Sequence, residues 1–380
     1  MVILPIASGK GGVGKSLLAS NLAIALGQAG KKVVLADLDL GASNIHLILG
    51  IGNVKKGIGT FLNNSQVAFE EIILDTEYDN VRFIPGDAEI PGMANVTTAQ
   101  KNKLIRRILD IQADFVILDL GAGTSYNIID FFLTSGQGII ITSPTLTATL
   151  NAYLFLKNAV FRIIYTSFDK KSPGRAYLEN LRKDGSSLQK VYIPKLLEKL
   201  NETDPSGFEI FHDRIEHFEP LLVMNLLEDP KDGDKAQKIR RSCKEYLGVD
   251  MEHLGVIYRD HLQDIALGSR IPVLVYKPQS VISQAIYRIA DKLIQKESLH
   301  ESLLDIRTFE ESFQTAELEA EIDYGIREHD VERLLHSGAL TRGDLIETVK
   351  TQQYEIQSLR KENQMLKVKL LKAANEGFQV

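Results

Sequence analysis

A glycine-rich run close to the start of the sequence constrains the fold more than any other segment. Residues 9–16 read GKGGVGKS and fit the pattern G-x-x-x-x-G-K-[ST], in which a loop wraps phosphate groups. Glycine permits this close wrapping because it has no Cβ, so several backbone N–H groups can point at one anion. The pattern therefore predicts phosphate contacts from Gly9, Gly11, Gly12, Val13, Gly14, Lys15, Ser16 and Leu17.

Two side chains of this loop are predicted to carry its chemistry. Lys15 is expected to reach the β- and γ-phosphates of a nucleotide, and the Ser16 hydroxyl is expected to ligate Mg²⁺. The apolar run at residues 2–6 predicts a buried strand before the loop, and residues 16–29 have the periodicity of a helix after it. The phosphates would then lie at a helix amino terminus, where unpaired N–H groups favour anions. A glycine-rich turn without a ligand is the alternative.

Two further apolar runs, residues 32–39 and 115–119, end in aspartate. Ligands of parallel sheets bind at the carboxyl ends of the strands, so these acids are expected beside the loop. Asp119 is predicted to hold the Mg²⁺ shell through water. Asp39 is predicted to contact the metal shell and to orient the attacking water in phosphoryl transfer. Asp37 is expected to contact the neighbouring loop or the metal shell.

Glycines follow the second of these strands directly, in the run Leu120–Thr124 (LGAGT). Such a segment can move and sense a γ-phosphate through a backbone N–H group, a role predicted here for Gly123. A simple strand-to-helix turn is the alternative.

The second lysine of the loop, Lys10, has no role in an ordinary phosphate cradle. Together with its neighbours (KGGVGKS) it resembles the deviant Walker A motif of the MinD/ParA ATPases. That resemblance implies that Lys10 crosses a dimer interface and contacts the nucleotide of the partner subunit, which makes Lys10, Lys15 and Asp39 the expected catalytic residues. It also implies ATP and Mg²⁺ as the ligands.

The resemblance extends over about residues 1–295. It includes DLDLGASNIHLILG (37–50), GIGTFL (57–62), FIPG (83–86), ITSPTLTATLNAY (141–153) and three expected later strands at 221–225, 254–257 and 271–275. An asparagine at the end of the sixth strand contacts adenine in this family, so Asn225 is assigned that role by resemblance. The sequence departs from the family at Gly121, where a proline is usual.

The expected fold class is α/β, with a mostly parallel twisted sheet flanked by helices, as in MinD-like P-loop NTPases. We expect an ATPase domain at residues 1–297 with a helical insert at about 165–220, an acidic helical connector at 298–343 and a coiled-coil helix at 344–376. The last segment carries a heptad pattern in which a lone Asn363 occupies an a position, as in parallel dimers. A docked amphipathic helix and a weak lipid anchor are the alternatives.

The composition of the chain limits which partners it is expected to bind and in which compartment it is expected to act. The formal net charge of −6 argues against a general polyanion binder, so DNA binding is not expected. The basic run at 235–244 is either a patch for DNA or acidic lipid or, more simply, a solvated helix face. The single cysteine, Cys243, excludes an intramolecular disulfide and the Cys-x-x-Cys pair of Mrp-type iron–sulfur carriers. We expect a cytoplasmic protein, with peripheral association at the inner membrane or a cell pole as the alternative.

These observations predict an ATP-switched regulator that forms a homodimer and responds to an activating or cargo protein. Within the MinD group, the order of motifs and the run DLGAG (119–123) most resemble the flagellar-number regulators of the FlhG/FleN/YlxH type. A division-site MinD and a ParA-type partition ATPase are the alternatives within the family. A nucleotide-gated coiled-coil adaptor with little hydrolysis is the alternative of another class.

Overall fold

An eight-stranded sheet forms the centre of the computed structural model, which describes all residues except 53, 87–95, 184–191, 300–308, 337–352 and 354–380. The strand order is β3-β4-β2-β5-β1-β6-β7-β8, and only the β3–β4 pair is antiparallel. The strands are β1 Val2–Ser8, β2 Val33–Leu38, β3 Leu74–Asp75, β4 Val81–Ile84, β5 Phe115–Ala122, β6 Ile139–Thr142, β7 Leu221–Leu227 and β8 Glu252–Tyr258. The predicted α/β class with a mostly parallel sheet is therefore confirmed.

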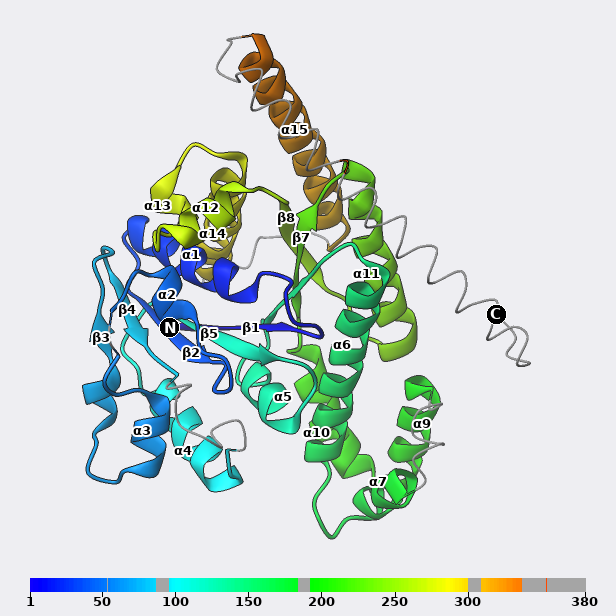
Figure 1. Cartoon of the computed structure of the whole chain (residues 1–380). Coiled ribbons are helices and arrows are strands. Elements are labelled where there is room, and N and C mark those ends of the chain that lie inside the picture. Colours follow the sequence, from blue (N-terminus) through cyan, green and yellow to red (C-terminus); the bar gives the residue numbers. More distant parts are fainter. Residues whose placement is uncertain (53, 87–95, 184–191, 300–308, 337–352, 354–380) are drawn as a thin grey trace, which may run out of the picture. The chain divides into compact units, whose positions relative to one another are not determined.

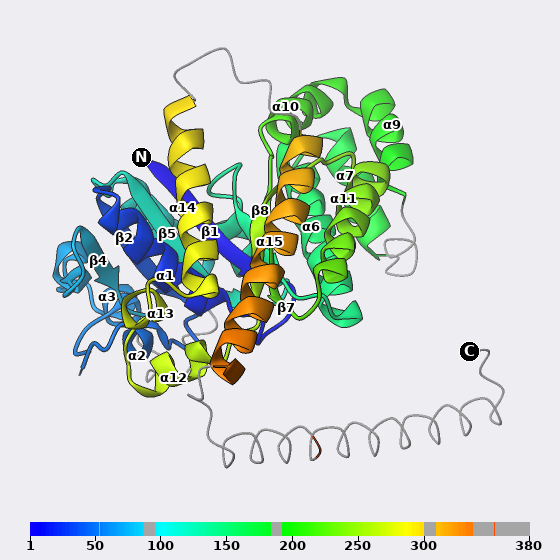
Figure 2. The ribbon, with the colours of Figure 1, turned by 90° about the horizontal axis from the view of Figure 1, so that it is seen from above.

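Helices cover both faces of this sheet (Figure 1). They are α1 Lys15–Gln28, α2 Ile45–Ile48, α3 Ile58–Asn63, α4 Thr98–Leu109, α5 Tyr126–Phe132, α6 Leu146–Ser167, α7 Pro173–Lys183, α9 Ile193–Thr203, α10 Pro205–Glu216, α11 Asp234–Leu247, α12 Leu262–Gly268, α13 Val273–Tyr276, α14 Val281–Leu299 and α15 Phe309–His336. Helices α1 and α14 pack together on one face, with α12 and α13 beside them, and α5 and α6 pack on the other (Figures 1 and 2). The strands between these layers are apolar and almost fully buried because both of their faces are covered.

One predicted strand is wrong. The apolar run at 271–275 does not join the sheet, and its last three residues belong to the short helix α13, Val273–Tyr276. The buried side chain of Asn21 accepts a hydrogen bond from the backbone N–H of Leu274 at 3.1 Å, so that group has a partner without a neighbouring strand. A short apolar run fits a buried helix as well as a buried strand, and its periodicity alone does not distinguish the two.

The described residues of the insert predicted at about 165–220 form α7, α9 and α10, which follow the long helix α6. Asp204 joins its two ends, because its carboxylate accepts hydrogen bonds from the backbone N–H groups of Gly174 at 3.3 Å and Gly207 at 3.1 Å. A hydrogen bond from the Ser172 side chain, and after it those from Gly207 and Gly174, lower the pKa of Asp204. The described helices of the insert therefore form a helical addition to the sheet domain.

The chain forms two compact units, residues 1–323 and 324–380. In the first unit, the part of α15 up to Asp323 buries Phe313, Ala316 and Ala320. The Tyr258 hydroxyl of edge strand β8 donates to the carbonyl oxygen of Ala320 at 2.8 Å. The predicted coiled coil at 344–376 lies outside the described residues, apart from residue 353. Within the described part of the chain, no helix combines the length and apolar character needed to cross a bilayer.

Candidate functional site

The glycine-rich loop joins the carboxyl end of β1, the central strand, to the amino terminus of α1. Gly12 and Gly14 have φ angles of 78° and 91°, a region that L side chains rarely adopt. Gly14 caps α1 without any side-chain hydrogen bond to its first turn. The first N–H groups of α1 therefore point out of the helix beneath the loop, which is the arrangement that binds phosphate.

One local and two long-range contacts hold the loop in this shape. The Ser8 hydroxyl donates to the carbonyl oxygen of Lys10 at 2.7 Å, and the Asn225 amide donates to the carbonyl oxygen of Val13 at 2.8 Å. A Cβ added at Gly9 would lie 2.1 Å from the carbonyl oxygen of Asn151 in α6, so this position admits only glycine. Sequence reasoning did not assign Ser8 or Asn151 to the loop, because Ser8 precedes the glycine-rich motif and Asn151 is distant from it in sequence.

Asp119 lies on β5 beside the loop and is 1 % exposed, yet neither of its carboxylate oxygens has a well-formed hydrogen bond to any described residue. Burial and the charge of Asp37 raise the pKa of Asp119 to about 8, against the opposing effects of the Ser16 hydroxyl and the Lys15 ammonium group. A buried carboxyl group without partners is costly. A divalent cation between Asp119 and Ser16 would remove that cost, so these residues fit the predicted Mg²⁺.

Asp37 contacts the loop after β2, one of the two positions expected for it. Its carboxylate accepts hydrogen bonds from the Ser43 hydroxyl at 2.6 Å and from the backbone N–H groups of Asp39 at 3.1 Å and Ile45 at 3.3 Å. Burial nevertheless raises the pKa of Asp37, against the effect of these hydrogen bonds. In the β2–β5 register Asp37 pairs with Asp119, so two acids stand side by side at the sheet edge.

Asp39 follows β2 directly and is half-buried. A Cβ added at Gly121 would lie 3.4 Å from its carboxylate, so Asp39 faces the segment that follows Asp119. The structure thus brings Lys15, Ser16 and the three aspartates to one edge of the sheet, as the sequence predicted.

Gly123 has a φ of 101°, and its backbone N–H donates to the carbonyl oxygen of Ser8 at 3.2 Å. The predicted phosphate sensor is therefore bound to the end of β1 in this state. Contact between this N–H group and a γ-phosphate would require that hydrogen bond to break.

Lys10 is exposed, and its ammonium group donates to the Thr147 hydroxyl of the same chain at 3.0 Å. Thr147 lies in the first turn of α6, the helix that also contacts Gly9. A reach across a dimer interface, as the resemblance implies, stays a prediction.

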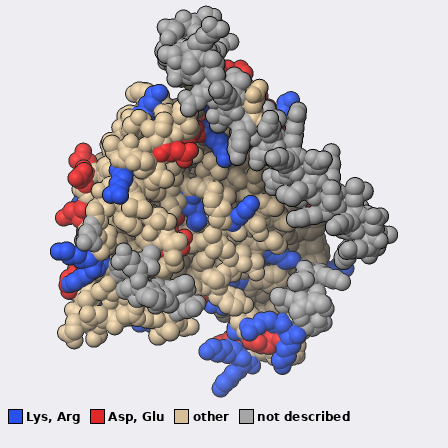
Figure 3. All heavy atoms as spheres, viewed as in Figure 1, with Lys and Arg blue, Asp and Glu red and all other residues tan. Residues whose placement is uncertain are grey.

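The basic run at 235–244 lies on helix α11, and some of its side chains form ion pairs within the domain. Arg240 is 7 % exposed and pairs with Asp250 at 2.7 Å and with Glu310, and Lys244 pairs with Asp250 at 3.0 Å. On the face shown in Figure 3, Lys and Arg side chains are dispersed, apart from a group over the insert at the lower end. This arrangement favours the solvated-helix interpretation of the run over a nucleic-acid patch.

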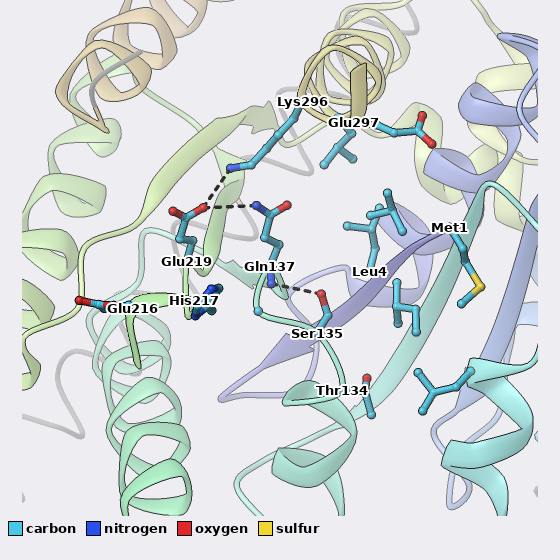
Figure 4. A pocket seen from close by; sticks show the side chains of 15 residues that line it. Met1, Leu4, Thr134, Ser135, Gln137, Glu216, His217, Glu219, Lys296 and Glu297 are labelled. Atoms are coloured by element: carbon cyan, nitrogen blue, oxygen red, sulfur yellow. Dashed lines mark hydrogen bonds and ion pairs between the residues drawn. The ribbon is translucent and has the colours of Figure 1, made fainter. Parts of the chain in front are cut away.

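A second cavity, of about 550 Å³, lies at the amino ends of the strands, at the edge opposite the loop. Its polar side chains pair with one another: Glu219 accepts a hydrogen bond from Gln137 at 3.3 Å and forms an ion pair with Lys296 at 3.9 Å (Figure 4). Ligands of open parallel sheets bind at the carboxyl ends of the strands. The loop edge is therefore the better candidate site.

Comparisons with known proteins agree with this geometry. The family model described as "CobQ/CobB/MinD/ParA nucleotide binding domain" matches residues 4–355. The flagellum site-determining protein YlxH of Helicobacter pylori is 29 % identical over 279 residues, which cover 64 % of this chain and 90 % of that protein. The septum site-determining protein MinD of the same organism is 29 % identical over 149 residues, which cover 39 % of this chain and 54 % of MinD. The match thus spans about half the length of that second relative.

Among solved structures, MinD of Pyrococcus horikoshii in complex with Mg-ADP has a TM-score of 0.54 and 22 % identity. The match covers 80 % of this chain and 99 % of that one. At this identity the likeness shows the fold alone, and it agrees with the mostly parallel sheet and its flanking helices.

Proposed function

Because the chain belongs to the CobQ/CobB/MinD/ParA nucleotide-binding family, we propose that it is an ATP-hydrolysing switch that dimerises with ATP and Mg²⁺ bound. The observation that carries the proposal is the buried, unpartnered carboxyl group of Asp119 beside a phosphate loop that caps α1. A cation beside Asp119 and a phosphate group at the first N–H groups of α1 would satisfy these polar atoms.

Each residue has a distinct role in this proposal. Lys15 neutralises charge at the β- and γ-phosphates, and Ser16 and Asp119 hold the Mg²⁺ directly or through water. Asp39 orients the water that attacks the γ-phosphate. The bound Mg²⁺ supplies charge neutralisation at the phosphate oxygens. Turnover by one subunit alone is expected to be slow, because the water is not fixed until the site is complete.

A measurement of ATP hydrolysis distinguishes this proposed switch from a nucleotide-gated adaptor with little hydrolysis. We expect ATP turnover by the full chain to fall by about a hundredfold in Lys15→Ala and Asp39→Ala, because each change removes a transition-state contact. Asp169→Ala, which removes an exposed aspartate of the insert, is the matched control and should turn over ATP like the unchanged chain. Equal turnover by Asp39→Ala and the unchanged chain would support the adaptor instead.

Complementation tests whether Lys10 acts in the partner's site. Lys10→Ala and Lys15→Ala are expected to be inactive alone. In a mixed dimer, the site that keeps Lys15 receives Lys10 from the other subunit. Equal co-expression of the two variants should therefore restore about a quarter of the activity, because half of the dimers are mixed and each has one working site. If Lys10 acts within its own chain, mixing restores nothing.

For the cellular role we propose control of flagellar number or placement through an activating or cargo protein. The match to YlxH supports this role because it spans 90 % of that protein. A division-site role is the second candidate, because 39 % of the chain also matches MinD. Fluorescent localisation of the intact protein beside Lys15→Ala, with flagella, septum and nucleoid marked, tests them. A polar or flagellar-base position supports the first role, a pattern set by the septum supports the second, and nucleoid coverage supports partition.

A further inference from the structure

Asn225 makes a contact with the phosphate loop that its family-assigned role at the adenine base does not explain. The residue lies on β7 and is 2 % exposed. Its side-chain amide donates to the carbonyl oxygen of Val13 at 2.8 Å, across 212 residues of sequence. The side chain therefore touches the centre of the loop rather than only the region where a base would lie.

The backbone around Asn225 is shaped for this contact. The register between β7 and β8 shifts between Asn225 and Leu227, which marks a bulge in the ladder. Leu226, the residue in the bulge, has a φ of 62°, a left-handed conformation that a leucine adopts only at a cost. Bulges next to functional sites redirect side chains, and this one occurs immediately after the residue that reaches the loop.

The same amide also sets the space available to Gly14. A Cβ built on Gly14 would lie 2.2 Å from the Asn225 amide nitrogen. Gly14 caps α1 and is followed directly by Lys15. The Asn225 amide thus packs against Gly14, where the loop ends and α1 begins. It also fixes the carbonyl group of Val13, the preceding residue.

We propose that Asn225 is a positioning residue for the phosphate loop: its amide holds the Val13 carbonyl and thereby sets the loop and the first N–H groups of α1 for phosphate. This inference rests on the proposed nucleotide binding. Without the amide donor, the buried Val13 carbonyl loses its partner and the loop gains freedom that a ligand must then remove. Affinity for phosphate groups should therefore fall whatever base is attached to them.

A base-free ligand distinguishes loop positioning from adenine recognition. We would measure the binding of Mg-ATP, Mg-GTP and Mg-tripolyphosphate to the full chain by calorimetry. In Asn225→Ala and in the near-isosteric, uncharged Asn225→Leu, the affinity for all three should fall by the same factor, about 5- to 30-fold. The ratio of ATP to GTP affinity should stay at the value of the unchanged chain.

Asn80→Ala is the matched control. The Asn80 side-chain amide also donates to a backbone carbonyl, that of Gly27 at 3.1 Å, but at the far end of α1. It should lower the thermal midpoint of unfolding by a similar amount and leave all three affinities unchanged. If Asn225→Ala does not fold, Asn225→Leu, which preserves the side-chain volume, decides the result.

Two results would overturn the inference. One is unchanged tripolyphosphate affinity together with a loss of discrimination between ATP and GTP, which would assign Asn225 to the base alone. The other is an equal loss of affinity in the Asn80 control, which would make the effect one of general stability. Failure of the proposed function is distinguishable from both, because the unchanged chain would then bind none of the three ligands.

Discussion

Replacement of Asp119 by asparagine should stabilise the nucleotide-free protein, and the gain should grow with pH. The folded protein holds the Asp119 carboxyl at a pKa of about 8, whereas the unfolded chain releases this proton near 3.8. Between these values the folded state binds one more proton than the unfolded state. The free energy of unfolding therefore falls as the pH rises through this window, by about 1.4 kcal/mol per pH unit.

Asparagine does not titrate, so the free energy of unfolding of Asp119→Asn lacks this dependence on pH. From pH 5 to pH 7 the variant should gain about 3 kcal/mol over the unchanged protein, two pH units of the slope above. Asp37 also has a raised pKa, but it is present in both proteins and largely cancels in the comparison. With Mg²⁺ and ATP present the order should reverse, because the cation favours the carboxylate and asparagine binds it more weakly.

Urea unfolding at pH 5, 6 and 7, followed by circular dichroism in the presence of a chelator, measures the difference. Asp114→Asn is the matched control, since it removes a carboxyl group just before the amino end of the same strand, where Asp114 accepts a hydrogen bond from the Lys32 backbone at 2.7 Å. A stability difference between Asp119→Asn and the unchanged protein that is constant across this range would refute the reasoning. It would mean that the carboxyl group is already ionised in the folded, cation-free protein.

Three other substitutions test separate contacts. Gly14→Ala places a methyl group 2.2 Å from the Asn225 amide at a φ of 91°, so it should abolish ATP binding in calorimetry; unchanged binding would show that the loop relaxes freely. Asp130→Ala removes the carboxylate that pairs with both Lys101, which is 5 % exposed, and Arg162, and should lower the free energy of unfolding in urea by about 3 kcal/mol. A loss below about 1 kcal/mol would show that these two ion pairs behave like solvent-exposed ones. Tyr258→Phe removes the 2.8 Å hydrogen bond to α15 and should speed hydrogen exchange in residues 309–323 while β1 stays protected; equal exchange in both proteins would contradict this.

The sequence predicted the loop edge of the sheet because its residues lie in contiguous motifs whose backbone geometry is strongly constrained. Glycine spacing fixes the loop, and an apolar strand that ends in aspartate fixes Asp119 at the same sheet edge. These motifs therefore predict that Lys15, Ser16, Asp37 and Asp39 lie together at this edge.

The remaining contacts depend on tertiary proximity that local patterns do not encode. Thr147 receives Lys10, and Asn151 packs on Gly9, only because α6 begins beside the loop. The hydrogen bond of Gly123 to Ser8 likewise depends on how β5 ends next to β1. The wrong prediction of a strand at 271–275 also results from a tertiary contact. The Asn21 side chain of α1 accepts the hydrogen bond from the Leu274 backbone N–H that a neighbouring strand would otherwise have accepted.

The bond between Asn225 and Val13 has a consequence for biosynthesis. The loop leaves the ribosome before the segments that complete it, because β1 pairs with β5 and β6, and the amide that holds the loop belongs to β7. Contacts between segments so far apart in sequence form late, because a long stretch of chain must first close on itself. The loop of the nascent chain therefore stays incomplete during synthesis until β7 has emerged, and before that point it should not retain ATP.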